Sequence, residues 1–116
     1  MVLYESFLLF SKAANREEIS TVVYHISKLA NTYHGLVLNT QDLGLRYTTH
    51  RINKPRVGVF WYGRYYYVAF AANPKIIPNL HKLYNSNSNI LRHTTMRMLY
   101  RTNLMTIPYS HHYEDL

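Results

Sequence analysis

Apolar residues along this chain recur at two different spacings, and these spacings predict a series of strands and helices. Residues 3–10 form a dense apolar and aromatic run with the length of a buried strand. Across residues 19–33, apolar side chains recur every three or four positions, which is typical of one face of a helix. Asn15 followed by Glu18 indicates the capped start of that helix. Gly35 is expected to end it in a left-handed conformation.

The middle of the chain predicts two further strands joined by a basic turn. Residues 36–52 have strand character, and Gly44 within them indicates a β-bulge or a close approach of two backbones. Proline, glycine and two basic residues mark a turn at residues 53–58. Residues 59–62 fit a strand and a loop equally well. Residues 64–72 are rich in aromatic side chains and predict a strand.

The last part of the pattern predicts a short helix and a final strand. Asn73 is expected to cap this helix, with Pro74 at its first position and apolar residues along 76–84. Pro78 is then expected to distort the first turn. Residues 90–100 predict the last strand. The order βαββαβ predicts an α+β, ferredoxin-like fold, a four-stranded antiparallel sheet with two helices on one face and the other face open.

Length and composition limit what this fold can contain. The pattern predicts one domain at residues 1–101 and a C-terminal tail at 102–116, and 116 residues suffice for one core but not for two. The absence of cysteine excludes disulfides, iron–sulfur clusters and thiolate zinc sites. No apolar run has the length of a membrane-spanning helix, so membrane insertion is not expected. The apolar run at residues 2–10 also lacks the basic start and cleavage site of a targeting peptide.

The distribution of charge indicates more about function than any motif does, because residues 43–113 contain ten basic side chains and no Asp or Glu. Same-sign charges repel and destabilise a compact state, so an acid-free stretch favours a polyanionic partner that supplies the missing charge. Nucleic acid is the leading candidate, since neutralised phosphates release counterions. A basic surface without function and an anionic membrane surface are the alternatives. The ten residues are Arg46, Arg51, Lys54, Arg56, Arg64, Lys75, Lys82, Arg92, Arg97 and Arg101.

Eight of these basic side chains are predicted to contact RNA, through phosphates rather than base edges. One group follows the ribbon formed by the second and third strands, because a protruding hairpin can reach into RNA. A second group lies on and after the last strand. The predicted RNA-binding residues are Arg46, Arg51, Lys54, Arg56, Arg64, Arg92, Arg97 and Arg101.

The aromatic third strand has a face on each side of the sheet. Its alternation predicts Tyr66, Val68 and Phe70 on the helix-covered side, which leaves Tyr65 and Tyr67 on the open face. Aromatic residues at such positions stack on unpaired bases in the RNA-recognition motif. The match to that motif is weak, because Tyr66 occupies a position where the motif has a small residue. Tyr65 and Tyr67 are therefore candidates for base stacking or for contact with a protein partner.

No constellation for catalysis or metal binding is evident. The seven histidines are scattered, and metal sites need three or four converging ligands. The six acidic residues include no pair able to flank a substrate, and no Gly-rich phosphate loop is present. No enzyme activity, metal or cofactor is expected, although a small ferredoxin-like enzyme remains a third hypothesis without positive support.

Several short motifs in order make the chain resemble a known family, the bacterial-type small-subunit ribosomal protein six (S-six). The resemblance runs from about residue 2 to residue 101 and is fairly specific in its order and spacing. Arg51 stands where the family often has proline, and the lack of acidic residues is more typical of a mitochondrial, fungal member. The motifs are Tyr4-Glu5, Leu43-Gly44-Leu45-Arg46, Ile52, the aromatic residues 65–70, and Asn89-Ile90-Leu91-Arg92.

The resemblance implies a structural role in the small ribosomal subunit. Family members bind the central domain of the small-subunit rRNA beside protein eighteen (S-eighteen), with which they form a heterodimer, and among other small-subunit proteins. A mitochondrial member implies location in the mitochondrial matrix. The alternative hypothesis is a free-standing domain that binds single-stranded RNA through Tyr65 and Tyr67.

Overall fold

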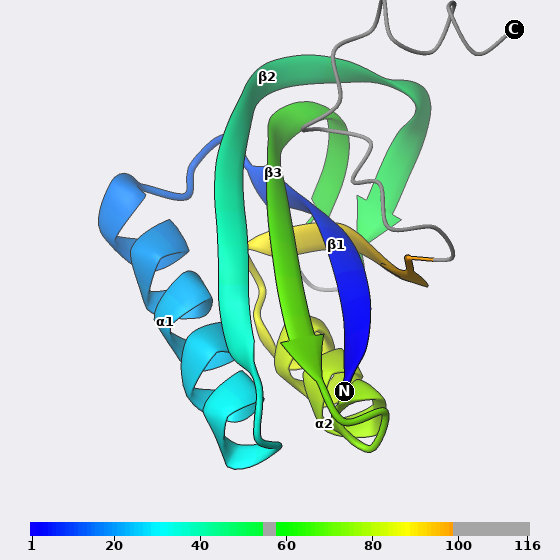
Figure 1. Ribbon diagram of the computed structural model, residues 1–116. Helices are drawn as coiled ribbons and strands as arrows, with labels where there is room; N and C mark the ends of the chain where they lie inside the picture. Colours follow the sequence, from blue (N-terminus) through cyan, green and yellow to red (C-terminus); the bar gives the residue numbers. More distant parts are fainter. Residues whose placement is uncertain (55–57, 99–116) are drawn as a thin grey trace, which may run out of the picture.

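The computed structural model describes residues 1–54 and 58–98, and it contains six elements in the order βαββαβ (Figure 1). The predicted tail at 102–116 lies outside the described residues, so its assignment stays a prediction. The elements are β1 (Val2–Ser11), α1 (Arg16–Thr32), β2 (Leu36–Lys54), β3 (Gly58–Ala72), α2 (Ile76–Ser86) and β4 (Ile90–Arg97).

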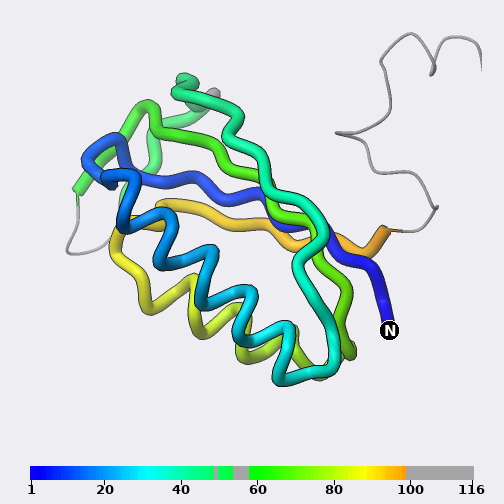
Figure 2. Tube along the Cα trace, turned by 60° about the vertical axis from the view of Figure 1, so that its left-hand side comes forward, coloured from blue at the N-terminus to red at the C-terminus, as the bar shows by residue number. Residues whose placement is uncertain are grey.

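The four strands form one antiparallel sheet in the order β2-β3-β1-β4, and both helices cover the same face (Figure 2). This arrangement confirms the predicted ferredoxin-like fold. The central strands β1 and β3 are the most continuously apolar, since each is flanked by a strand on both sides. The main core lies between helices and sheet. It is formed by Tyr4, Leu8, Phe10, Ile19, Val22, Ile26, Ala30, Val68, Phe70, Ala72, Ile76, Leu80, Tyr84 and Ile90.

Helix α1 begins as predicted but ends differently. The Asn15 side chain accepts a 2.8 Å hydrogen bond from the Glu18 amide, which is the expected cap. The left-handed residue after the helix is His34, at φ 63°, and not Gly35. Gly35 is needed for a different reason, because a Cβ there would lie 1.7 Å from the Ala71 carbonyl oxygen. The segment between α1 and β2 therefore lies directly against the backbone of β3.

Helix α2 begins at Ile76 rather than at Pro74. Asn73 instead stabilises the preceding turn, where its side chain accepts from the Lys75 amide at 3.0 Å. The later start places Pro78 within the first turn, where backbone amides have no intrahelical partner. The start at Pro74, on which the expected distortion by Pro78 is based, is wrong; the distortion itself stays a prediction.

The β2–β3 hairpin bends over the face of the sheet that carries no helix (Figure 1). Residues 59–62, for which the sequence favours neither strand nor loop, belong to β3. Ile52 and Phe60 oppose one another and pack on Leu9, which points away from the helices. The hairpin therefore does not protrude freely, and it covers part of the predicted open face. This second cluster consists of Leu9, Ile52, Phe60, Tyr65 and Leu91.

Candidate functional site

A β-bulge in β2 separates two hollows on opposite faces of the hairpin. The register with β3 shifts between Asp42 and Gly44, and Gly44 has a φ of 86°. The Asp42 side chain holds the bulge by accepting from the Gly44 amide at 2.8 Å. Asp42 opposes Tyr66 on the helix side, whereas Leu43 lines a hollow with Tyr65 on the other face. The bulge that Gly44 predicts is confirmed, and it directs adjacent residues to different surfaces.

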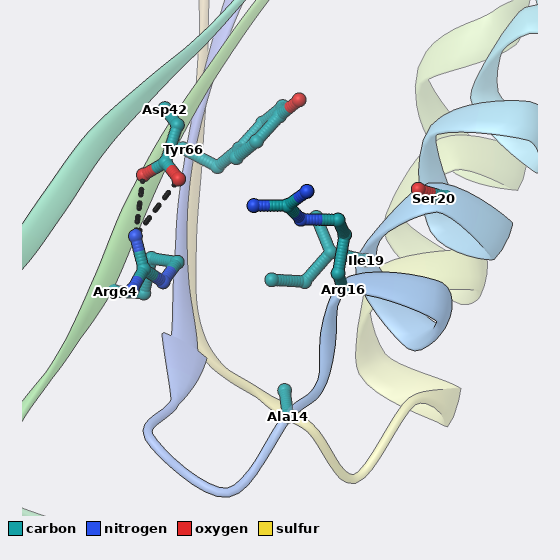
Figure 3. A pocket seen from close by; sticks show the side chains of 7 residues that line it. All are labelled: Ala14, Arg16, Ile19, Ser20, Asp42, Arg64 and Tyr66. Carbon is teal, nitrogen blue, oxygen red and sulfur yellow. Dashed lines mark hydrogen bonds and ion pairs between the residues drawn. The ribbon is translucent and has the colours of Figure 1, made fainter.

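The hollow on the helix side has a volume of about 450 Å³ and lies between the start of α1 and the hairpin (Figure 3). Arg64 Nη1 donates to both carboxylate oxygens of Asp42, at 2.8 and 3.0 Å. Partial burial opposes ionisation of Asp42. Hydrogen bonds from Gly44 and Arg64, with the charges of Arg64 and Arg16, outweigh it and hold the Asp42 pKa below its usual value. The lining residues are Ala14, Arg16, Ile19, Ser20, Asp42, Arg64 and Tyr66.

The hollow on the open face has a volume of about 410 Å³ and combines aromatic, aliphatic and cationic walls. Arg46 Nε donates to the Leu43 carbonyl at 3.2 Å, which folds its side chain along the bulge. Tyr47 is exposed and rests against Tyr62, with ring centroids 5.3 Å apart. The lining residues are Phe7, Leu43, Arg46, Tyr47 and Tyr65. Such a mixture suits contact with a protein segment more than with a bare phosphate backbone.

The two tyrosines predicted on the open face differ in accessibility. Tyr65 is half-buried beside the hollow, but Tyr67 is 0% exposed. The Tyr67 ring lies 5.2 Å from that of Phe7, and its hydroxyl donates to Glu5 at 2.7 Å. Tyr67 lies on the expected side of the sheet but has no free ring face to offer. Tyr67 is therefore not available to contact a partner, which corrects that expectation. The hypothesis that bases stack on both Tyr65 and Tyr67 is left with Tyr65 alone.

The basic residues of the hairpin do not form one patch. Arg46 opposes Gly63 and lies on the open face, whereas Arg64 points to the helix side. Arg51 is exposed toward the far end of β2. The Lys54 side chain and Arg56 lie outside the described part of the structure. The alternation of side chains along the paired strands therefore distributes the hairpin's predicted RNA-binding residues over two surfaces.

The second predicted basic group is also divided. Arg92 opposes Leu9 on the open face, and Arg97 opposes Tyr4, whose side chain belongs to the helix-side core. The pairing of β1 with β4 is regular between these two positions, so the two arginines point to opposite faces. Arg101 lies outside the described residues.

Two exposed aromatic residues on the hairpin were missed by sequence reasoning. Trp61 is 58% exposed and Tyr47 is 82% exposed. Trp61 falls in the segment 59–62, where apolar side chains follow one another without a polar position that marks the exposed face. The alternation with Phe60, which packs inward, becomes visible only once the segment is known to be a strand.

Within residues 1–54 and 58–98, no three His, Asp or Glu side chains come together to hold a metal ion. In the same ranges, no helix has both the length and the apolar character needed to cross a membrane.

Comparison with known proteins identifies the family. The model of the family described as Ribosomal protein S6 matches residues 3–97. The chain is 32% identical over 90 residues to the small ribosomal subunit protein bS6 of Helicobacter pylori (strain Shi470), covering 77% of this chain and 59% of that protein. It is 28% identical over 98 residues to the bS6 protein of Granulibacter bethesdensis, covering 84% of this chain and 60% of that relative. The chain thus spans less than two thirds of the length of these relatives.

The fold agrees with the family match. The crystal structure of 30S ribosomal protein S6 from Thermotoga maritima superposes with a TM-score of 0.69 at 22% identity, covering 84% of this chain and 87% of that one. The matched family and relatives are ribosomal proteins, which agrees with the expectation of a structural rather than an enzymatic role. The family model, the relatives and the resemblance of the short motifs lead to one conclusion. The chain belongs to the ribosomal protein S6 family.

Proposed function

We propose that this protein is a structural constituent of the small ribosomal subunit and binds its rRNA through phosphates. The observation that carries the proposal is family membership combined with an acid-free, basic stretch over residues 43–113. Arg51 and Arg97 are exposed and lie on strands, where the sheet holds the backbone in place. Each such side chain that neutralises a phosphate adds to affinity and to its dependence on salt.

The open face of the sheet is the proposed contact for a neighbouring protein, S-eighteen. Leu3 and Met96 remain 38% and 41% exposed there, next to the half-buried rings of Phe7 and Tyr65. Phe7 and Tyr65 also line the open-face hollow with Arg46. An apolar patch with an aromatic hollow and a cationic rim has the composition of a protein interface. Other small-subunit proteins are the further neighbours expected in such an assembly.

We further propose that the ribosome is mitochondrial and that the protein works in the matrix. The net charge of +7 and the absence of acidic residues over residues 43–113 support this finer assignment. A surface that carries few acidic residues is suited to extensive burial against nucleic acid. Fractionation tests it directly, because the protein should be protected from protease inside intact mitochondria and degraded once both membranes are dissolved.

Sedimentation tests the ribosomal role. A native lysate is resolved on a sucrose gradient at low and then at moderate salt, and this protein is followed through the fractions. We expect it to migrate with the small subunit under both conditions. Migration as a free small protein at low salt would contradict the ribosomal assignment, whatever the compartment.

A paired substitution tests the protein interface. Met96→Glu places a charge on the open face, and we expect it to reduce co-purification of S-eighteen. Tyr24→Glu is the matched control, since Tyr24 is similarly exposed, at 58%, but lies on α1, which covers the other face of the sheet. Equal losses from both substitutions would show that the open face is not the contact.

A further inference from the structure

The helix-side hollow is a second potential binding surface, formed by residues far apart in the sequence. Figure 3 shows the Arg16 side chain reaching from the start of α1 toward the sheet, across from Asp42 and Arg64. The Tyr66 ring extends from β3 into the same space. Its volume of about 450 Å³ falls within the range of about 300–1,000 Å³ of small-molecule sites. It is separate from the open face, because Tyr66 points to the helix side.

The charges of this hollow favour an anion. Asp42 cancels only one of the two positive charges, so the lining retains a net positive charge. Arg64 uses a single nitrogen, Nη1, to bind Asp42, and its other N–H groups have no partner among the described residues. Within the same part of the structure, no carboxylate lies at ion-pair distance from Arg16. Two planar guanidinium groups with unused donors match the oxygen atoms of a phosphate.

The hollow also offers a wall for a flat ring. Tyr66 is half-buried, and Phe10 supports it edge-on, with ring centroids 6.2 Å apart. Ile19 and the Ser20 side chain line the same space from α1. A ring held by the core in this way loses little conformational freedom when a base stacks on it. The hollow therefore combines an anion site, a stacking surface and a hydroxyl group.

We propose that this hollow binds a single unpaired nucleotide, its phosphate between Arg16 and Arg64 and its base against Tyr66. A base in a duplex is stacked between its neighbours and cannot enter a hollow between a helix and a sheet, whereas a base extruded from a loop can. The choice of an RNA nucleotide over a free mononucleotide rests on the proposed ribosomal function. The proposal adds Arg16 and Tyr66, which the charge pattern of the sequence does not single out.

The first test is an NMR titration of the full chain with inorganic phosphate, adenosine 5′-monophosphate and a short oligoadenylate. We expect the mononucleotide to shift the backbone amides of Ala14, Arg16, Ser20 and Tyr66 and to bind more tightly than phosphate. Tighter binding of the oligoadenylate at the same amides would identify a strand of RNA as the source. Tightest binding of the mononucleotide would identify a free nucleotide instead and overturn the RNA part. Shifts confined to other surfaces, or equal binding of phosphate, would overturn the proposal.

Substitutions separate the hollow from general attraction to a basic protein. Arg16→Gln should raise the Kd for adenosine 5′-monophosphate about tenfold, and Tyr66→Leu should raise it by a similar factor. Lys28→Gln is the matched control, because it removes the same charge from α1 at a residue outside the lining. Arg16 is exposed, so its substitution is compatible with folding even where Tyr66→Leu is not. Equal effects of Arg16→Gln and Lys28→Gln would refute the site.

Binding to small-subunit rRNA distinguishes this proposal from the ribosomal one. If the wild-type chain binds the rRNA but the titration leaves the hollow unshifted, the hollow proposal fails and the ribosomal role stands. If mononucleotide binding centres on the hollow while rRNA and the small subunit are not bound, the nucleotide site stands and the ribosomal role fails.

Discussion

Tyr67 and Glu5 form a buried hydrogen bond on the face of the sheet that carries no helix. The Tyr67 hydroxyl donates to Glu5 Oε1 at 2.7 Å, and Glu5 is only 5% exposed. The two residues are diagonal neighbours, since Tyr67 opposes Phe7 and Glu5 opposes Ala69. A buried carboxylate is costly unless a donor satisfies it, so this contact ties β1 to β3 and keeps the tyrosine from outside partners.

Tyr67→Phe should therefore destabilise the fold. Leaving the buried carboxyl oxygen of Glu5 without its donor should cost about 1–3 kcal/mol of the free energy of unfolding, measured by urea denaturation. Tyr65→Phe is the control, because no hydrogen bond from the Tyr65 hydroxyl is found among the described residues, and its effect should stay within about 0.5 kcal/mol. Similar losses from the two substitutions would show that the bond to Glu5 contributes little.

Two glycines should respond very differently to substitution by alanine. A Cβ at Gly35 would lie 1.7 Å from the Ala71 carbonyl oxygen, so Gly35→Ala should cost about 3 kcal/mol or more, or prevent folding. At Gly44 the space is open but φ is 86°, so Gly44→Ala should cost only about 1–2 kcal/mol. Thermal unfolding of both variants checks the order. A reversed order would mean that backbone conformation outweighs the contact.

Asp42 should make stability depend on pH at the acid end. Its pKa is lower in the folded protein than in the unfolded chain, so its contribution is complete above the unfolded pKa of about 3.9 and is lost as pH falls through the folded pKa. We expect Asp42→Asn to be less stable than wild type at pH 7, with the difference shrinking below about pH 4. Urea midpoints measured across this range check it. A difference that does not change with pH would show that the charge of Asp42 is unimportant.

Arg92 and Arg97 should contribute unequally to RNA binding, because they lie on opposite faces of β4. Arg92 shares the open face proposed for the protein neighbour. We therefore expect Arg97→Gln to lower the slope of log K against log salt by about 0.9 with small-subunit rRNA, and Arg92→Gln to leave it nearly unchanged. Filter binding over a salt series gives both slopes. Equal reductions would indicate that RNA wraps around the edge strand.

The elements themselves followed from local sequence patterns. The cap at Asn15 and the alternation of Tyr66, Val68 and Phe70 depend on residues within a few positions of one another, and the structure confirms both. The error at the end of α1 has a long-range origin. His34 takes the left-handed position because Gly35 is needed against Ala71, a contact between distant parts of the chain. No pattern within the helix can predict a neighbour that arrives from another strand.

The same limit applies to the candidate surfaces. The sequence by itself determined the order of strands and helices, the sides of the sheet and the basic character, because periodicity and charge are properties of neighbouring residues. The tertiary structure decided which side chains stay accessible and which converge. Tyr67 is buried against Glu5 and Phe7. Arg16 and Arg64 line the same hollow only because α1 packs beside the bulged hairpin. These outcomes depend on long-range pairing, which local spacing does not encode.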